Sequence, residues 1–203
     1  MTLDLSSLSD GELASLSLAG RESAFTEIVR RHRSVLYRLA VGNVGDADEA
    51  LDIVQEAFVA AHQALKRYDP ARPMRAWLAS IAINKCRDWA RRRAVRRLFS
   101  FALPMDASVE NVADGRPGHD VETADRQELA RLRRAIADLP MSLREPLVLH
   151  VIEGISQAET AAILAVTAKA VETRIRRARI KLAEALDHRA LLASGEVSVP
   201  PWP

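Results

Sequence analysis

Residues 156–188 read SQAETAAILAVTAKAVETRIRRARIKLAEALDH, and this stretch decides how the second half of the chain folds. Ser156 stands three residues before a glutamate, which is the spacing of a capping box and predicts a helix over 156–166. A second helix is predicted over 168–188, which leaves a very short turn between the two. Two helices joined by such a turn are typical of a helix-turn-helix.

The second of these helices has one apolar side and one basic side, with a net charge of +5 over residues 169–181. The residues that recur at helical spacing and are expected to pack inward are Val171, Ile175, Ala178 and Leu182. The residues expected on the outer arc are Lys169, Glu172, Thr173, Arg176 and Arg179, and those flanking the apolar stripe are Arg174, Arg177 and Lys181. Such an outer face suits the major groove of duplex DNA. A solvated basic helix is the alternative, but acidic partners four residues further along the helix are missing.

A second basic segment, residues 85–97, has a net charge of +6 and ends a helix predicted to begin near Met74. Two prolines, Pro70 and Pro73, separate this helix from the preceding one. The residues predicted to share one of its sides are Trp77, Asn84, Arg87 and Arg91. Aromatic, amide and guanidinium groups together suit the unstacked bases and phosphates of single-stranded DNA. Burial of the tryptophans in a core is an equally open interpretation.

Apolar residues recur at helical spacing along nearly the whole chain, and alternating β-branched runs are absent, which predicts an all-α fold. A capping box at Ser9 predicts the first helix, and a second helix begins near Ser23. The other helices are predicted over 46–68, 74–97, 121–138 and 142–153. The last of these also has capping-box spacing, between Ser142 and Glu145.

The periodicity lapses over residues 98–127, where acids, prolines and glycines predict a flexible acidic linker. The linker divides the chain into two small helical domains, 1–97 and 128–188, each with a small core of its own. Residues 189–203 are predicted to form a flexible tail.

Composition excludes several classes of protein. With 48% apolar and 28% charged residues among 203, the chain is neither disordered nor fibrous. A single cysteine, Cys86, allows no internal disulfide, and neither a membrane-spanning run nor a secretory signal is found, so we expect a soluble, uncleaved, cytoplasmic protein. Scattered histidines and the absence of a glycine-rich phosphate loop predict no metal, no cofactor and no enzyme.

Five motifs together resemble the extracytoplasmic-function group of bacterial RNA polymerase sigma factors, short sigma-70 relatives that keep domains two and four. The motifs are AF at 24–25, DIVQEAF at 52–58, YDPARPMRAWL at 68–78, IAIN at 81–84 and RIRRAR at 174–179. The resemblance covers about residues 20–97 and 128–186. It implies a sigma domain 2 helical bundle and a sigma domain 4 helix-turn-helix, joined by the linker.

The resemblance also implies roles for particular residues. The polymerase clamp helices would bind a polar helix face, which by itself is only an ordinary exposed face: Asp52, Gln55 and Glu56. A flipped base of the minus-ten element would be held by Tyr68, Arg75, Trp77 and Asn84, with Lys85, Arg87 and Arg91 on the backbone. The minus-35 element would be read by Thr173, Arg176 and Arg177, with Lys169, Arg174 and Arg179 on phosphates.

The function so implied is binding to core RNA polymerase and promoter-specific initiation, in a stress, envelope or nutrient response, under the control of an anti-sigma factor. Two departures from the family pattern concern specificity: Glu172 replaces a base in the recognition helix, and Met74 stands where an aromatic residue is common. An autonomous helix-turn-helix regulator of duplex DNA is the alternative. A third interpretation is a protein-interaction scaffold whose basic segments contact RNA. This interpretation gives no role to the short turn of the helix-turn-helix.

Overall fold

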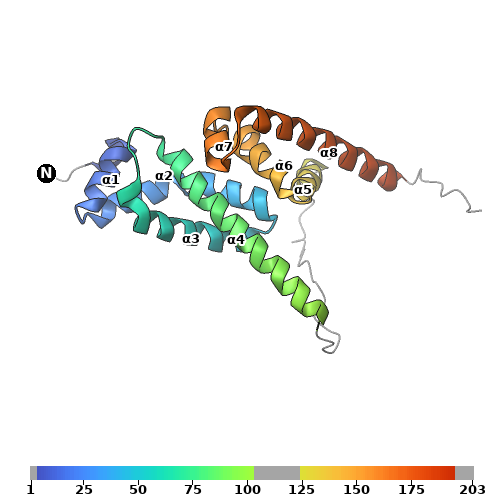
Figure 1. Ribbon diagram of the computed structural model, residues 1–203, viewed down its shortest axis with the longest axis horizontal. Helices are drawn as coiled ribbons and strands as arrows, with labels where there is room; N and C mark the ends of the chain where they lie inside the picture. Colours follow the sequence, from blue (N-terminus) through green and yellow to red (C-terminus); the bar gives the residue numbers. More distant parts are fainter. Residues whose placement is uncertain (1–3, 103–123, 195–203) are drawn as a thin grey trace, which may run out of the picture.

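The computed structural model describes the backbone of residues 4–102 and 124–194, and the side chains of residues 4–97 and 128–186. These ranges are helical and contain no strand, which confirms the all-α prediction. The N-terminal module comprises α1 (Asp10–Leu18), α2 (Glu22–Val44), α3 (Ala47–Ala64) and α4 (Met74–Ala102), with 3-10 turns at Leu5–Ser7 and Leu65–Arg67. The C-terminal module comprises α5 (Ala124–Ala137), α6 (Met141–Pro146), a π-helical turn (Leu147–Ile152), α7 (Gln157–Leu164) and α8 (Ala168–Ser194) (Figure 1).

The N-terminal module is a bundle in which α2, α3 and α4 contact one another and α1 lies against α2. Its fully buried side chains include Ile28, Leu36, Leu39, Leu78 and Ile83. Local capping fixes the helix starts, because the predicted capping box at Ser9 forms and Asp46 accepts two main-chain hydrogen bonds at the start of α3. At the end of α2, Gly45 takes the left-handed conformation, with φ of 77°, that commonly closes a helix.

The C-terminal module confirms one predicted capping box and corrects another. Ser156 caps α7, where its hydroxyl accepts from the main chain of Glu159 and the Glu159 carboxylate accepts from the main chain of Ser156. The predicted box at Ser142 is wrong, because α6 begins after Pro140 without a side-chain cap. Glu145, the expected partner of Ser142, instead accepts two hydrogen bonds from Arg87 of α4.

The two modules pack directly against each other. α4 contacts α7, and α2 contacts α5, α6 and the π-helical turn. A Cβ at Gly42 of α2 would lie 3.1 Å from both methyl groups of Val148, so the glycine permits the close approach. The buried side chains of both modules form one continuous cluster. The expectation of a separate core in each module is therefore corrected, because each small module buries part of its apolar surface against the other.

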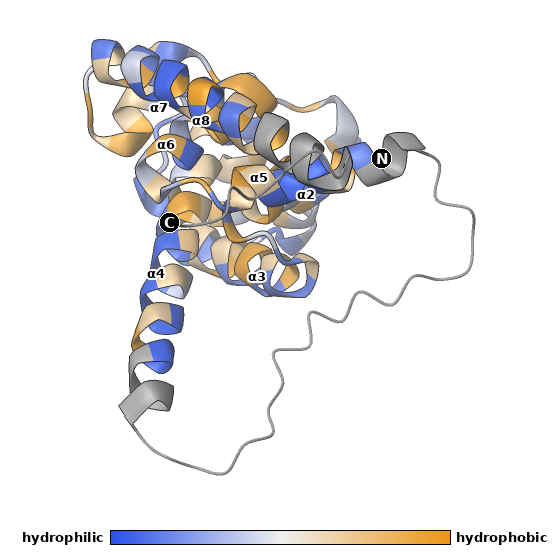
Figure 2. Ribbon diagram, turned by 90° about the vertical axis from the view of Figure 1, so that its right-hand side faces the viewer, coloured by the Kyte–Doolittle hydropathy of each residue, from blue (hydrophilic) through white to orange (hydrophobic). Residues whose placement is uncertain are grey.

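The predicted linker, 98–127, overlaps the end of α4 and the start of α5, and its central part, 103–123, lies outside the described residues. The predicted tail overlaps the end of α8, and residues 195–203 also lie outside. The C-terminal part of α4 projects away from the other helices (Figures 1 and 2), and residues 91–97 are exposed. Among the described residues, no helix combines the length and the apolar character needed to cross a bilayer.

Candidate nucleic-acid and polymerase interfaces

The N-terminal half of α8 is anchored by its apolar side and lines a hollow with its polar side. Val171 and Ala178 are fully buried, as the periodicity predicts. The turn before α8 is set by Ala165, whose φ of 55° is left-handed, and by Thr167, whose hydroxyl accepts from the main chain of Ala170 at 3.1 Å. The residues lining the hollow are His150, Gln157, Lys169, Glu172, Thr173, Ile175, Arg176, Arg179 and Ile180.

The structure brings together four of the six predicted minus-35 residues, namely Lys169, Thr173, Arg176 and Arg179. The other two lie outside the hollow, with Arg177 exposed and Arg174 half-buried. Within the hollow, Lys169 pairs with Glu172 at 3.1 Å, so this acid partly offsets the local positive charge.

Sequence reasoning missed two residues of this hollow. His150 comes from the π-helical turn, and its Nδ1 bonds the carbonyl oxygen of Ile155 at 2.8 Å. Gln157 donates from Nε2 to the carbonyl oxygen of Ala168, also at 2.8 Å, and so ties α7 to the start of α8. No local pattern distinguishes these side chains, because both reach the hollow only through the packing of three elements.

Asp52, Gln55 and Glu56 lie together on α3, as predicted, and share a shallow hollow with Val59, Ala60, Gln63 and Lys85. Glu56 lies 3.3 Å from Lys85 and 3.8 Å from Arg92, both on α4. Lys85, which is predicted to contact the DNA backbone, has its ammonium group beside the acidic face of α3. This face combines carboxylates with exposed apolar atoms of Val59.

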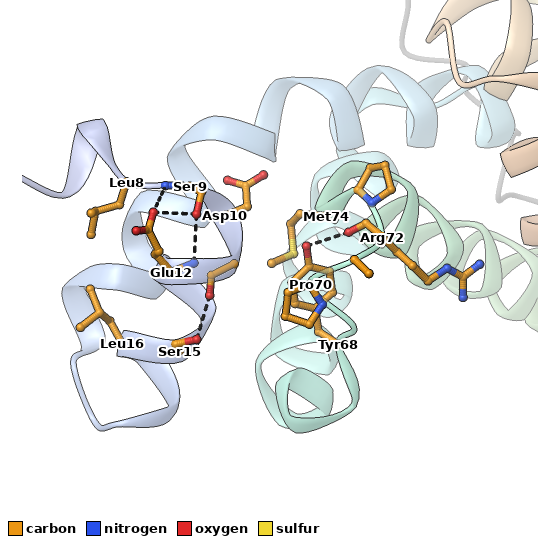
Figure 3. A pocket seen from close by; sticks show the side chains of 13 residues that line it. Leu8, Ser9, Asp10, Glu12, Ser15, Leu16, Tyr68, Pro70, Arg72 and Met74 are labelled. Carbon is orange, nitrogen blue, oxygen red and sulfur yellow. Dashed lines mark hydrogen bonds between the residues drawn. The ribbon is translucent and has the colours of Figure 1, made fainter.

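The loop before α4 is held by its own contacts and faces α1. The Tyr68 hydroxyl donates to the carbonyl oxygen of Arg72 at 2.8 Å, and the Tyr68 ring lies 5.2 Å from the ring of Trp77. Figure 3 shows the loop across a hollow from α1, with Tyr68, Pro70 and Met74 on one side and residues 8–16 on the other. The predicted base-holding loop is therefore open toward α1.

The opposite side of this loop and of α4 faces the C-terminal module. Arg75 donates to the main-chain carbonyl of Glu153, and Arg87 donates twice to Glu145 at 2.7 Å. Trp77 is partly buried and lines a narrow cleft with Glu159 and other residues of α7. An exposed single-strand surface on a separate body was expected, and the structure corrects this expectation, because the C-terminal module lies against part of it.

The remaining predicted minus-ten residues are accessible. Asn84 is exposed, and its Oδ1 accepts from Arg87 at 3.5 Å. Arg91 is exposed and pairs with Asp88 within the same helix. The predicted set is therefore divided: Arg75, Trp77 and Arg87 contact the C-terminal module, whereas Asn84 and Arg91 face outward.

Two other residues of α4 are structural. Trp89 is 7% exposed and donates from its indole nitrogen to Glu49 at 2.7 Å. Cys86 is 3% exposed, and burial raises the pKa of its thiol to about 12, so the thiolate is not formed near neutral pH. The described residues contain no cluster of histidine, cysteine and acidic side chains able to hold a metal ion.

The fold and these surfaces are those of an all-helical protein with a basic helix-turn-helix. The chain matches the family model of sigma-70 region 2 over residues 28–96 and that of sigma-70 region 4 over residues 129–182. Both matches fall on the predicted domains, the first on α2 to α4 and the second on α5 to α8.

Curated relatives match along most of their length. The chain is 42% identical to the RNA polymerase sigma factor CnrH of Cupriavidus metallidurans, over 88% of this chain and 94% of that protein. It is 34% identical to the ECF RNA polymerase sigma factor SigM of Mycobacterium tuberculosis, over 89% of this chain and 86% of that protein. The chain belongs to the sigma-70 family of RNA polymerase sigma factors, in its extracytoplasmic-function group.

Solved structures agree with this assignment. CnrH in complex with the cytosolic domain of CnrY aligns with a TM-score of 0.65 and 37% identity, over 88% of this chain and 97% of that one. The sigma factor RpoE of Bartonella quintana, solved with the anti-sigma factor NepR, shares the fold with a TM-score of 0.64 and 22% identity, over 80% and 96% of the two chains. The protein is thus a transcription initiation factor, which acts with core RNA polymerase at promoters.

Proposed function

We propose that the hollow of α8 reads the minus-35 element as duplex DNA. Thr173 and Arg176 face base edges in the major groove, and Lys169 and Arg179 bind phosphates. Arg177 and Arg174, which lie outside the hollow, serve the neighbouring base and phosphate. The observation that carries this proposal is the gathering of four predicted DNA contacts in one exposed hollow of a helix-turn-helix.

The minus-ten element binds the loop before α4 and the exposed side of that helix. Tyr68, Arg75, Trp77 and Asn84 hold a base that has left the stack, and the energy of holding it offsets the few kcal/mol of unstacking and unpairing. The backbone contacts are Lys85, Arg87 and Arg91. The hollow in Figure 3 supports this role, because the loop that would hold the base is open there.

The acidic face of α3 binds the polymerase. Asp52, Gln55 and Glu56 lie on one exposed helix face, which suits a basic helix of the partner. In this proposal polymerase supplies the chemistry, and the chain directs it to promoters. The chain acts where polymerase works, in the cytoplasm.

The functional division of the chain follows the predicted one: 1–97 for polymerase and the minus-ten element, 128–188 for the minus-35 element, with the linker 98–127 and the tail 189–203. An anti-sigma factor holds the chain inactive until a signal arrives. The solved complexes of related sigma factors with CnrY and with NepR support such a partner.

Transcription in vitro tests this function. Core polymerase with the purified chain is expected to start transcription on genomic promoter fragments that core polymerase alone ignores, and Arg176→Ala is expected to reduce this initiation. Arg131→Ala, an exposed arginine of α5, serves as the matched control and should leave initiation unchanged. Binding of duplex DNA without any association with polymerase would contradict the proposal and favour an autonomous regulator.

A further inference from the structure

Glu172 is the single acid among the described residues that line the hollow of α8. The other charged residues of the lining are basic, namely Lys169, Arg176 and Arg179. Attraction between basic side chains and phosphates supplies much of the affinity for DNA, and an acid among them weakens it. A carboxylate in this hollow is therefore a disadvantage unless it makes a specific contact with the DNA.

Helix stability does not account for an acid at this position. Glu172 is the fifth residue of α8, and the favourable interaction of an acid with a helix N-terminus falls off within the first turn. The ion pair of Glu172 with Lys169 joins side chains that are 62% and 82% exposed. Such an exposed pair contributes little to stability.

The ion pair with Lys169 leaves half of the carboxylate free. The Lys169 ammonium group lies 3.1 Å from Oε2 of Glu172, and among the described residues no other group pairs with this side chain. Arg176 follows at the spacing at which an acid and a base commonly pair along a helix, yet it forms no ion pair with Glu172. The hollow therefore offers DNA a free carboxylate oxygen, Oε1, beside a free guanidinium.

A carboxylate oxygen only accepts hydrogen bonds, and this limits the bases that it suits in the major groove. Cytosine presents an amino donor there, whereas guanine presents two acceptors and thymine an acceptor and a methyl group. Adenine presents an amino donor beside an acceptor, which repels the carboxylate. Cytosine is therefore the base that fits best. Base contacts of a helix-turn-helix come from the N-terminal part of the second helix, where Glu172 lies.

We propose that Glu172 is a specificity residue, whose Oε1 accepts a hydrogen bond from the N4 amino group of a cytosine in the minus-35 element. Lys169 is its positioning residue, because it holds the carboxylate through Oε2 and leaves Oε1 to the base. This inference rests on the proposed reading of the minus-35 element by α8 and deepens it. It adds to that reading one named base and the atom that recognises it.

The first test is a selection with holoenzyme, formed from core polymerase and the full-length chain. The DNA is one promoter that the holoenzyme uses, with its minus-35 region randomised, and the bound fraction is sequenced. The wild type is expected to enrich cytosine at one position of this region. Glu172→Gln gives the side chain a donor beside its acceptor, which is the pattern that pairs with adenine. The preference at that position is therefore expected to change from cytosine to adenine.

The second test measures the affinity of holoenzyme for two promoters that differ only at this base pair. The wild type is expected to prefer the promoter with cytosine by about tenfold, and Glu172→Gln the promoter with adenine. Glu184→Gln is the matched control, because Glu184 is an exposed acid of the same helix outside the hollow. It makes the same change in charge and should keep the preference of the wild type.

Reversal of the charge gives a third, independent test. Glu172→Lys replaces an acceptor by a group that only donates, and a lysine in the major groove pairs with guanine. Affinity should rise on every promoter because a repulsive charge is removed, and the preference at the same position should change from cytosine to guanine. A rise in affinity with no change of preferred base would overturn the proposal.

The remaining outcomes separate this inference from the proposed function. Uniformly tighter binding by Glu172→Gln, with the wild-type preference kept at every position, would show that Glu172 acts by charge alone and would overturn the contact with cytosine. A wild-type selection that enriches other bases but no cytosine would overturn it as well. Failure of the proposed function looks different, because the wild-type holoenzyme would then show no preference at any randomised position.

Discussion

Arg176 shows how a single side chain can separate base reading from phosphate binding. It is exposed on the outer arc of α8, and it lines the hollow together with Thr173 and the paired Lys169 and Glu172. A guanidinium in the major groove recognises one base pair, whereas a phosphate contact contributes to every sequence alike. Substitution of Arg176 therefore distinguishes a base contact from a phosphate contact.

We expect Arg176→Ala to cost about 1–3 kcal/mol of binding at one base-pair position and little at the others. The measurement is the affinity of holoenzyme for a set of promoters, each with one substituted base pair in the minus-35 region. An equal loss on every promoter would reassign Arg176 to the phosphate backbone.

Glu27 of α2 is a carboxyl group whose pKa depends on its contacts in the folded chain. Hydrogen bonds from Arg30 and Arg31 lower the pKa of this carboxyl from 4.5 to about 2. Arg31 also reaches Asp10 at 3.1 Å and the carbonyl oxygens of Leu5 and Ser6, so it ties the N-terminal segment to α2. Protonation of Glu27 removes an acceptor from this network.

A lowered pKa in the folded state means that Glu27 stabilises the fold above about pH 4.5 and loses this effect as the pH falls toward 2. In Glu27→Gln, the free energy of unfolding in urea should therefore fall less steeply between these pH values than in the wild type. Glu22→Gln, an exposed residue of the same helix, is the control. Parallel curves for Glu27→Gln and the wild type would show that the network does not depend on this charge.

At the scale of elements, two serines with the same sequence signature differ in what they do. Ser156 caps α7 through a reciprocal pair with Glu159, whereas Ser142 lies inside the first turn of α6 and caps nothing. We expect Ser156→Ala to destabilise the protein by about 1 kcal/mol. Ser142→Ala should change stability by no more than a few tenths of this amount, as measured by urea unfolding. Equal losses in the two variants would contradict the assigned helix starts.

Most elements could be predicted because their determinants are local. Apolar periodicity located the helices, and the caps of α1 and α7 lie within three residues of their partners. The π-helical turn over Leu147–Ile152 was predicted as ordinary helix, because the same residues satisfy either pattern. Glu145 misled the prediction because its true partner, Arg87, is 58 residues away.

At the scale of the whole molecule, the arrangement of the modules could not be predicted. It depends on pairs such as Arg38 with Glu153 and on the contact of Gly42 with Val148, none of which has a local signature. The outer face of α8 could be predicted because a single helix forms it. Which part of the minus-ten surface is accessible could not be predicted, because this depends on how the C-terminal module packs against α4.

The central claim is that two unlike DNA surfaces of one chain act together on the polymerase, one on duplex DNA and one on the opened strand. A combined footprint of the holoenzyme on one promoter tests it most directly, with DNase for protection and permanganate for unpaired thymines. We predict protection over the minus-35 element together with reactive thymines at the minus-ten element, and loss of the reactivity alone in Asn84→Ala. Protection without reactive thymines in the wild type, or reactivity unchanged in Asn84→Ala, would contradict the account.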